Sequence, residues 1–327
     1  MPRTARTIGK WVGIVAIIGV AALTVTYPIV DLTRSPLDDT ARAQLSSQGA
    51  AGRFVPTSQG VMHVRISGPE NGPVVMLVHG GVVGGYGFEN WQKPLAAAGF
   101  RVLVPDLLGY GYSDRPDVTY DRAFYMKQLT ELLDGLGVTT KVNLVGASFG
   151  GGIVTAFTAE HPTRVASAAL MSPAGGGRVP LVPAEFMLWP VIGDWIFRVA
   201  TPSIVTNQMN TAYANSPNRA AMESWMGEQT RFRGFGEGIL HALRDYDSGW
   251  QPDALDGLGR SGVPTMLVWG TADAVHPYAL SQQWTSRIPR AELVTLEGAG
   301  HAITYGRAED VLASVIPFLG EVGGAAR

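Results

Sequence analysis

Short, continuously apolar runs alternate along this chain with longer stretches whose apolar residues recur at helical spacing. A short apolar run bounded by turn residues is typical of a strand that is buried on both faces. The strands predicted in this way span residues 61–66, 73–78, 101–104, 141–145, 167–171, 263–269 and 291–296. The helices predicted between and after them span residues 88–98, 120–136, 150–160, 277–287 and 308–319. This alternation predicts an α/β fold with a doubly wound, mostly parallel sheet that helices cover on both faces.

The interval between the predicted strands at 167–171 and 263–269 is too long for a simple connection. We therefore expect residues 175–258 to form a helical cap over the carboxyl ends of the strands, where open α/β sheets bind ligands. The interval is rich in large apolar side chains, among them Trp189, Trp195 and Trp225. Most of these are expected to pack the cap onto the core, and a few to line an apolar pocket.

The N-terminal region contains a long apolar segment. Residues 11–30 carry no charged side chain, and as a helix they would extend about 30 Å, the thickness of the hydrocarbon core of a bilayer. Basic residues precede the segment at Arg3, Arg6 and Lys10, so the positive-inside rule places the rest of the chain on the extracytoplasmic side of a membrane. The alternative is a signal peptide cleaved near Ala41-Arg42-Ala43, which would give a secreted protein.

The composition argues against several classes of function. The formal net charge is −2, and nothing in the charge pattern points to a nucleic-acid partner. The chain has no cysteine, which removes disulfides, a thiol nucleophile and thiolate metal sites. No paired histidine spacing suggests a metal site, and no glycine-rich loop has the features of a nucleotide site. We therefore expect neither a metal nor a cofactor.

The clearest chemical signal is Gly146-Ala147-Ser148-Phe149-Gly150. It lies between a predicted strand and a predicted helix, where a serine is held in a sharp, strained turn with its hydroxyl exposed. Glycine on either side leaves room for that turn, because a Cβ would clash there. Ser148 is therefore the predicted nucleophile.

A second segment, His79-Gly80-Gly81, follows the predicted strand at 73–78. Acyl transfer needs backbone N–H groups aimed at the oxygen that becomes negative in the tetrahedral intermediate. The N–H groups of Gly81 and Phe149 are the predicted donors of this oxyanion hole. Asp106, in the loop after the strand at 101–104, is expected to order its loop rather than to do chemistry.

A serine hydroxyl needs a base to remove its proton, and that base is usually histidine. Of the six histidines, His301 follows the last predicted strand on a glycine-rich loop, from which it could reach Ser148. It is the predicted base, and His276 is the second candidate. Asp273, shortly after the strand at 263–269, is the predicted acid that orients His301.

These segments together resemble the α/β-hydrolase superfamily over roughly residues 55–320. The matching segments are His79-Gly80-Gly81, Asp106 to Ser113, Gly146 to Gly150, Gly270 to Asp273 and Gly300-His301. The resemblance implies a triad in the chain order Ser148, Asp273, His301 and no cofactor. The expected division is a membrane anchor or uncleaved signal at 1–30, a linker at 31–54, the hydrolase core at 55–174 and 259–327, and the cap at 175–258.

The function implied is a serine hydrolase of carboxylesterase or lipase type, acting on a small-molecule ester through an acyl-enzyme. The anchor and the apolar cap favour a lipid-like acyl group. One alternative is a carbon–carbon bond hydrolase of ring-cleavage products, although many of these carry a tryptophan shortly after the catalytic histidine, where this chain has Ala302 and Ile303. Another alternative is a non-catalytic, membrane-tethered binding protein.

Overall fold

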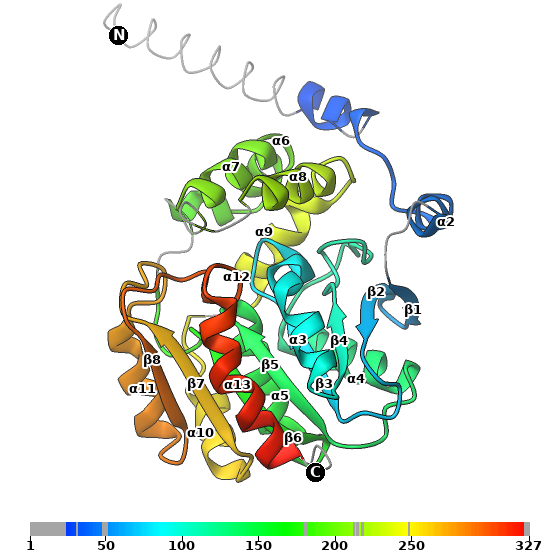
Figure 1. The fold of residues 1–327 in the computed structure, drawn as a ribbon. Helices are drawn as coiled ribbons and strands as arrows, with labels where there is room; N and C mark the ends of the chain where they lie inside the picture. The colour runs from blue at the N-terminus through cyan, green and yellow to red at the C-terminus, as the bar shows by residue number, and fades with distance from the viewer. Residues whose placement is uncertain are drawn as a thin grey trace, which may run out of the picture.

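An eight-stranded sheet runs through the centre of the molecule, in the order β1-β2-β4-β3-β5-β6-β7-β8 (Figure 1). The computed structural model describes residues 24–30, 32–47, 52–179, 182, 184–211, 213, 216, 219–247 and 249–323. The strands are β1 (Arg53–Thr57), β2 (Gly60–Ser67), β3 (Val74–Val78), β4 (Arg101–Pro105), β5 (Val142–Ala147), β6 (Val165–Met171), β7 (Thr265–Gly270) and β8 (Glu292–Leu296). β2 is antiparallel to β1 and to β4, whereas all other neighbouring strands are parallel. The predicted mostly parallel sheet is thus confirmed.

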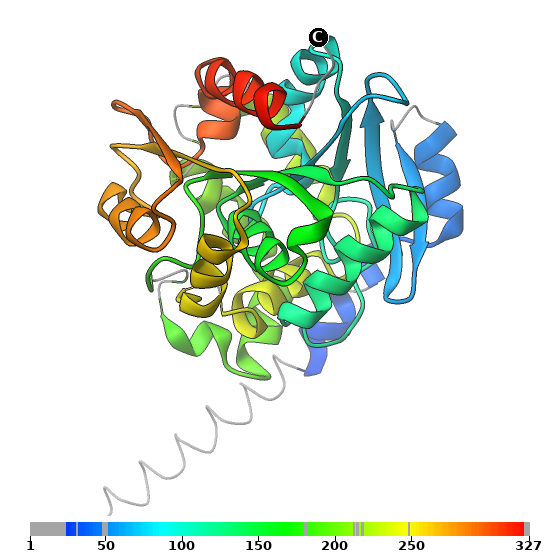
Figure 2. The same ribbon diagram turned by 90° about the horizontal axis from the view of Figure 1, so that it is seen from below.

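Helices cover both faces of the sheet, so that β3 is buried along its whole length. Figure 2 shows α3 (Gln92–Ala97) and α13 (Ala308–Gly323) on one face and α4 (Arg122–Gly135), α5 (Phe149–Glu160) and α10 (Pro252–Ser261) on the other. Successive side chains of a strand point to opposite faces. In β3, Val75 and Leu77 accordingly belong to one apolar core and Met76 and Val78 to the other.

Several shorter helices complete the core. These are α2 (Asp39–Ser47), η1 (Gly84–Trp91), η2 (Pro162–Arg164), η4 (Tyr278–Leu280), α11 (Ser281–Arg287) and α12 (Ile303–Gly306). The predicted helix at 88–98 is in fact divided between the 3₁₀ helix η1 and α3, and the predicted helix at 277–287 begins with the 3₁₀ turn η4. Pro94, in the first turn of α3, cannot donate the backbone hydrogen bond that would continue a regular helix from η1.

The cap lies between β6 and β7 and sits over the carboxyl ends of the strands (Figure 1). It contains η3 (Glu185–Leu188), α6 (Ile192–Val199), α7 (Thr201–Thr211), α8 (Arg219–Gln229) and α9 (Phe235–Asp245). α10 lies partly inside the predicted cap interval but packs against α5 on the sheet. A Cβ on Gly257 would lie 2.7 Å from Cβ of Ala159, so glycine permits the close approach of the two helices. The cap therefore ends before α10, earlier than the predicted boundary at residue 258.

The chain before the sheet packs against the cap. Residues 24–30 are helical; Trp195 Nε1 of α6 donates to Thr26 Oγ1 at 2.8 Å, and the Arg198 guanidinium lies 3.5 Å from the centre of the Tyr27 ring. Most of the predicted membrane segment, residues 11–23, lies outside the described residues. Within the part of the chain that the structure does describe, no helix has the length and apolar character to cross a bilayer.

The predicted linker at 31–54 is largely structured. It contains α2, and its end forms the start of β1. This strand was not predicted, because the apolar run Phe54-Val55 is short and is followed by Pro56. Leu45 of α2 packs against Tyr112 and Phe232. The linker therefore joins the core to the cap.

Candidate active site

Ser148 occupies the sharp turn between β5 and α5. Its backbone has φ 50° and ψ −117°, a strained conformation for a residue with a side chain. A Cβ on Gly146 would lie 2.6 Å from the Gly150 carbonyl oxygen, and a Cβ on Gly150 would lie 2.2 Å from the Val78 carbonyl oxygen. The turn can therefore form only because both flanking residues are glycine, as the sequence motif predicts.

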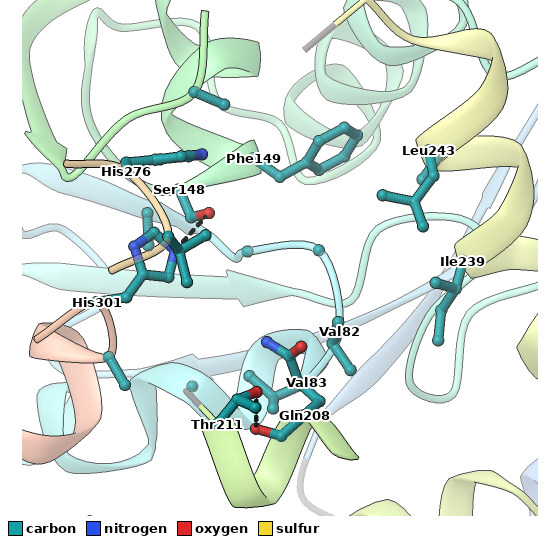
Figure 3. A pocket seen from close by; sticks show the side chains of 18 of the residues that line it. Val82, Val83, Ser148, Phe149, Gln208, Thr211, Ile239, Leu243, His276 and His301 are labelled. Carbon is teal, nitrogen blue, oxygen red and sulfur yellow. Dashed lines mark hydrogen bonds between the residues drawn. The ribbon is translucent and has the colours of Figure 1, made fainter. Parts of the chain in front are cut away.

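The structure brings Ser148, His301 and Asp273 together at the carboxyl ends of β5, β8 and β7. His301 Nε2 lies 2.9 Å from Ser148 Oγ (Figure 3), and His301 Nδ1 lies 2.9 Å from Asp273 Oδ2. Because a carboxylate can only accept, Nδ1 carries the ring proton and Nε2 is free to accept from the serine hydroxyl. This is the geometry that general-base activation of a serine requires.

Asp273 is buried, and the loop around it holds its carboxylate in place. The N–H groups of Val275 and His276 donate to Asp273 Oδ1 at 2.9 and 2.8 Å. Burial alone would raise the pKa of Asp273, but the hydrogen bond and charge of His301 and the N–H of His276 outweigh it and lower that pKa. The Asp273 carboxyl therefore stays ionised at neutral pH, so that its charge can stabilise a protonated His301.

Gly80 and Gly81 pass directly beside the nucleophile. A Cβ on Gly80 would lie 3.5 Å from Ser148 Cβ, and a Cβ on Gly81 would lie 3.7 Å from Phe149 Cβ. Within the described chain, the N–H groups of Gly81 and Phe149 donate to no backbone carbonyl. Both predicted oxyanion donors therefore lie next to Ser148 with their hydrogens uncommitted.

His79 fixes the position of this loop. The Leu107 N–H donates to His79 Nε2 at 2.9 Å, so the ring proton is on Nδ1, which donates to the Gly80 carbonyl at 2.7 Å. Burial lowers the pKa of His79 and keeps it neutral. Both ring nitrogens are thus committed to the backbone, and His79 acts as a positioning residue for the glycine loop.

Asp106 orders the neighbouring loop, as the sequence analysis expected. It accepts from the N–H groups of Gly85 and Tyr112 at 2.9 and 3.1 Å and contacts His63 Nδ1 at 2.9 Å. Burial would raise the pKa of Asp106, but the hydrogen bond and charge of His63 and the nearby Arg65 guanidinium hold it well below its ordinary value. Asp106 is therefore a buried anion that holds the loop and does not reach the nucleophile.

A cavity of about 780 Å³ opens onto Ser148 between the sheet and the cap. Figure 3 shows Ile239 and Leu243 of α9 on one side, Phe149 with Ser148 and His301 on another, and Gln208 and Thr211 of α7 near Val82 and Val83. Among the described residues that line it, none is an aspartate, glutamate, lysine or arginine. The cavity thus has apolar walls, both aliphatic and aromatic, and neutral hydrogen-bonding groups. That α7 would contribute Gln208 and Thr211 could not be predicted from the sequence, because their position depends on how the cap docks on the core.

His276, the second candidate for the base, is buried next to the triad. Its ring centre lies 4.8 Å from that of His301, at an interplanar angle of 81°. Its Nδ1 is bonded to the Ser172 carbonyl at 2.8 Å. His276 therefore does not take the place of His301 at Ser148, but it lines the same cavity.

Residues 73–307 match the family model described as "alpha/beta hydrolase fold". The chain belongs to the α/β-hydrolase family. It is 25% identical over 297 residues to a 2-hydroxy-6-oxononadienedioate/2-hydroxy-6-oxononatrienedioate hydrolase of Paraburkholderia xenovorans (strain LB400), covering 86% of this chain and 99% of that relative. The resemblance drawn from the sequence motifs is thus confirmed.

Solved structures share the fold of this α/β hydrolase. An esterase from Thermogutta terrifontis aligns with a TM-score of 0.69 and 23% identity, covering 83% of this chain and 99% of the other. A bacterial membrane phospholipase A aligns with a TM-score of 0.68 and 24% identity, covering 95% of this chain and 98% of the other. At this level of identity the likeness establishes the common architecture.

Proposed function

We propose that this α/β hydrolase cleaves neutral carboxylic esters with an apolar acyl group. The observation that carries the proposal is the uncharged cavity that opens directly onto Ser148. A cavity with apolar walls favours an acyl chain by the burial of apolar surface, which stabilises binding by about 0.8 kcal/mol for each buried CH₂. Its neutral polar groups can hydrogen-bond an ester or alcohol without the need for a counter-charge.

The reaction follows from the arrangement of the site. Ser148 Oγ attacks the ester carbonyl carbon while His301 Nε2 takes the hydroxyl proton, and Asp273 stabilises the protonated imidazole. The N–H groups of Gly81 and Phe149 hold the negative oxygen of the tetrahedral intermediate. His301 then gives its proton to the leaving alcohol oxygen, leaving an acyl-enzyme on Ser148. Water, deprotonated by His301, releases the carboxylic acid and restores the serine.

A second candidate is a carbon–carbon bond hydrolase, because the curated relatives with a named activity include several hydrolases of hydroxy-oxo-dienoates. These names describe substrates that carry one or two carboxylates. A protein site normally holds a carboxylate with arginine or lysine, and the described lining of this cavity contains neither. This difference in charge favours the ester over the dienoate.

The test compares the detergent-solubilised full chain with its Ser148→Ala variant on both classes of substrate. We expect turnover of p-nitrophenyl esters by the unaltered protein, and a loss of roughly 10⁴- to 10⁶-fold in the variant. Turnover of a 2-hydroxy-6-oxo-dienoate that exceeds ester turnover would replace the ester proposal with the carbon–carbon one. A folded protein that turns over neither would favour the non-catalytic, membrane-tethered binding protein.

We further propose that residues 11–30 anchor the protein in a membrane, with the hydrolase on the extracytoplasmic side. The uncharged segment and its preceding basic residues support this orientation. At the alternative cleavage site, Arg42 lies within α2 and pairs with Asp39 and Asp114, so α2 would have to detach before cleavage. Alkaline extraction of membranes tests the proposal; recovery of a shortened chain in the soluble fraction would support the secreted alternative.

A further inference from the structure

His276 presents a second ring nitrogen near the nucleophile that the mechanism above does not use. Ser172 contributes a carbonyl oxygen, which can only accept, so the His276 proton is on Nδ1 and donates to it at 2.8 Å. Nε2 is consequently an unprotonated acceptor. Among the described residues, none hydrogen-bonds this nitrogen, and His276 lines the cavity that contains Ser148 and His301.

Hydrogen bonds hold the backbone of His276 on both sides. The His276 N–H donates to Asp273 Oδ1 at 2.8 Å, and the Trp269 indole donates to the His276 carbonyl at 2.8 Å. Burial, together with the neighbouring charge of His301, lowers the pKa of His276 to about 4. The side chain is therefore neutral at physiological pH, and its free nitrogen accepts rather than donates.

The chemistry of the proposed function determines which part of a substrate meets this nitrogen. His301 Nε2 must return a proton to the leaving alcohol oxygen, so the alcohol lies against His301 when the intermediate collapses. The His276 ring centre is only 4.8 Å from that of His301 (Figure 3). A substituent on the alcohol, one or two bonds beyond the leaving oxygen, therefore passes beside His276.

A buried acceptor discriminates strongly between substituents. A substrate hydroxyl that donates to His276 Nε2 replaces the hydrogen bond to water that this nitrogen loses when substrate binds. A methyl in the same place leaves the nitrogen desolvated and without a hydrogen-bond partner. Gln208 and Thr211 of α7 line the same cavity near Val82 and Val83 (Figure 3), and neither side chain carries charge. A leaving alcohol with a hydroxyl beside His276 is therefore favoured over one with a methyl there.

We propose that His276 is a specificity-determining residue that accepts a hydrogen bond from a hydroxyl of the leaving alcohol, so that the preferred substrates are acyl esters of neutral polyhydric alcohols. This inference rests on the proposed ester hydrolysis and names the alcohol for that same site. On this proposal, the preference for hydroxylated leaving alcohols depends on His276 Nε2, and not on Ser148 or His301.

The test uses the full chain in detergent with two esters of the same fatty acid, the 2-hydroxyethyl ester and the propyl ester, which differ by a hydroxyl in place of a methyl. We expect kcat/KM to favour the 2-hydroxyethyl ester about tenfold, the value of one neutral hydrogen bond. His276→Phe keeps a flat ring without the nitrogen, and the ratio of the two kcat/KM values should fall to about one. His276→Gln can place an amide oxygen near the same point and should restore part of the ratio.

The possible outcomes separate the two proposals. If the unaltered protein shows no preference, or if His276→Phe keeps it, the role of His276 is overturned while ester hydrolysis stands. A purely structural role would slow both esters equally and leave the ratio unchanged, which also overturns the inference. If His276→Phe fails to fold, the ratio in the Gln variant decides, because a structural residue would leave it at the native value. Failure to hydrolyse any ester would overturn the proposed function itself.

Discussion

The hydrolase core and the cap enclose the same cavity but fix their side chains in different ways. On the core side, hydrogen bonds determine the tautomer of each histidine that lines the cavity. Backbone groups hold His79 and His276, and the Asp273 carboxylate holds His301. On the cap side, Ile239 and Leu243 of α9 present aliphatic surface to the cavity. Hydrogen bonds therefore fix the polar groups on the core side, whereas the cap contributes apolar side chains whose size we expect to select the acyl chain.

The substitution Asp273→Asn tests how hydrogen bonds hold the histidines on the core side, and it is expected to have the largest effect. An amide can present its N–H to His301 Nδ1 and so favour the wrong tautomer, which removes the base from Ser148. We expect kcat to fall about 10⁴-fold, with little change in the thermal unfolding midpoint. Asp117→Asn is the matched control, since its side chain is fully exposed. A loss in kcat of less than tenfold for Asp273→Asn would mean that another group orients His301.

Two glycine substitutions compare the packing of the core with that of the cap. A Cβ on Gly150 would lie 2.2 Å from the Val78 carbonyl oxygen, whereas a Cβ on Gly227 in α8 meets nothing within 4 Å. We expect Gly150→Ala to lower the free energy of unfolding by about 3 kcal/mol or more. Gly227→Ala should raise it by about 0.5–1 kcal/mol, because alanine loses less backbone entropy in a helix. Denaturant titration measures both, and equal effects would contradict the comparison.

The buried anion at Asp106 predicts how the stability of the core depends on pH. Its folded pKa lies well below the value of about 3.9 in an unfolded chain, so its contribution to stability is present above that pH and is lost as the pH falls below it. We expect Asp106→Asn to cost about 3 kcal/mol of unfolding free energy at pH 7, and the difference to shrink below pH 4.

An exposed carboxylate provides the control for that prediction. Asp253 pairs with Arg122, but its side chain is 66% exposed, so solvent and salt screen the pair. Asp253→Asn should therefore cost no more than about 1 kcal/mol. If the difference in unfolding free energy between Asp106→Asn and the unaltered protein stays constant from pH 7 to pH 3, the loss of stability comes from packing alone.

Features of this protein could be predicted from the sequence where the interacting residues lie close together along the chain. The serine turn could be predicted because its constraints are local: Gly146 and Gly150 are each within a few residues of the strained backbone of Ser148. The sheet could be predicted because strands buried on both faces need unbroken apolar runs. By contrast, the docking of α10 on α5 and the tautomer of His276 depend on partners, Ala159 and Ser172, that lie about a hundred residues away along the chain.

The cap half of the comparison is tested by changing the size of one aliphatic side chain. Leu243 lines the cavity from α9 (Figure 3), so Leu243→Trp should fill space that a long acyl chain would occupy. Each excluded methylene forfeits about 0.8 kcal/mol of binding, so kcat/KM for long-chain p-nitrophenyl esters should fall about tenfold relative to the acetate. Leu243→Ala should shift the optimum towards longer chains. If both variants fold normally and the chain-length profile does not move in opposite directions, Leu243 does not contact the acyl chain, and α9 does not select the substrate by chain length.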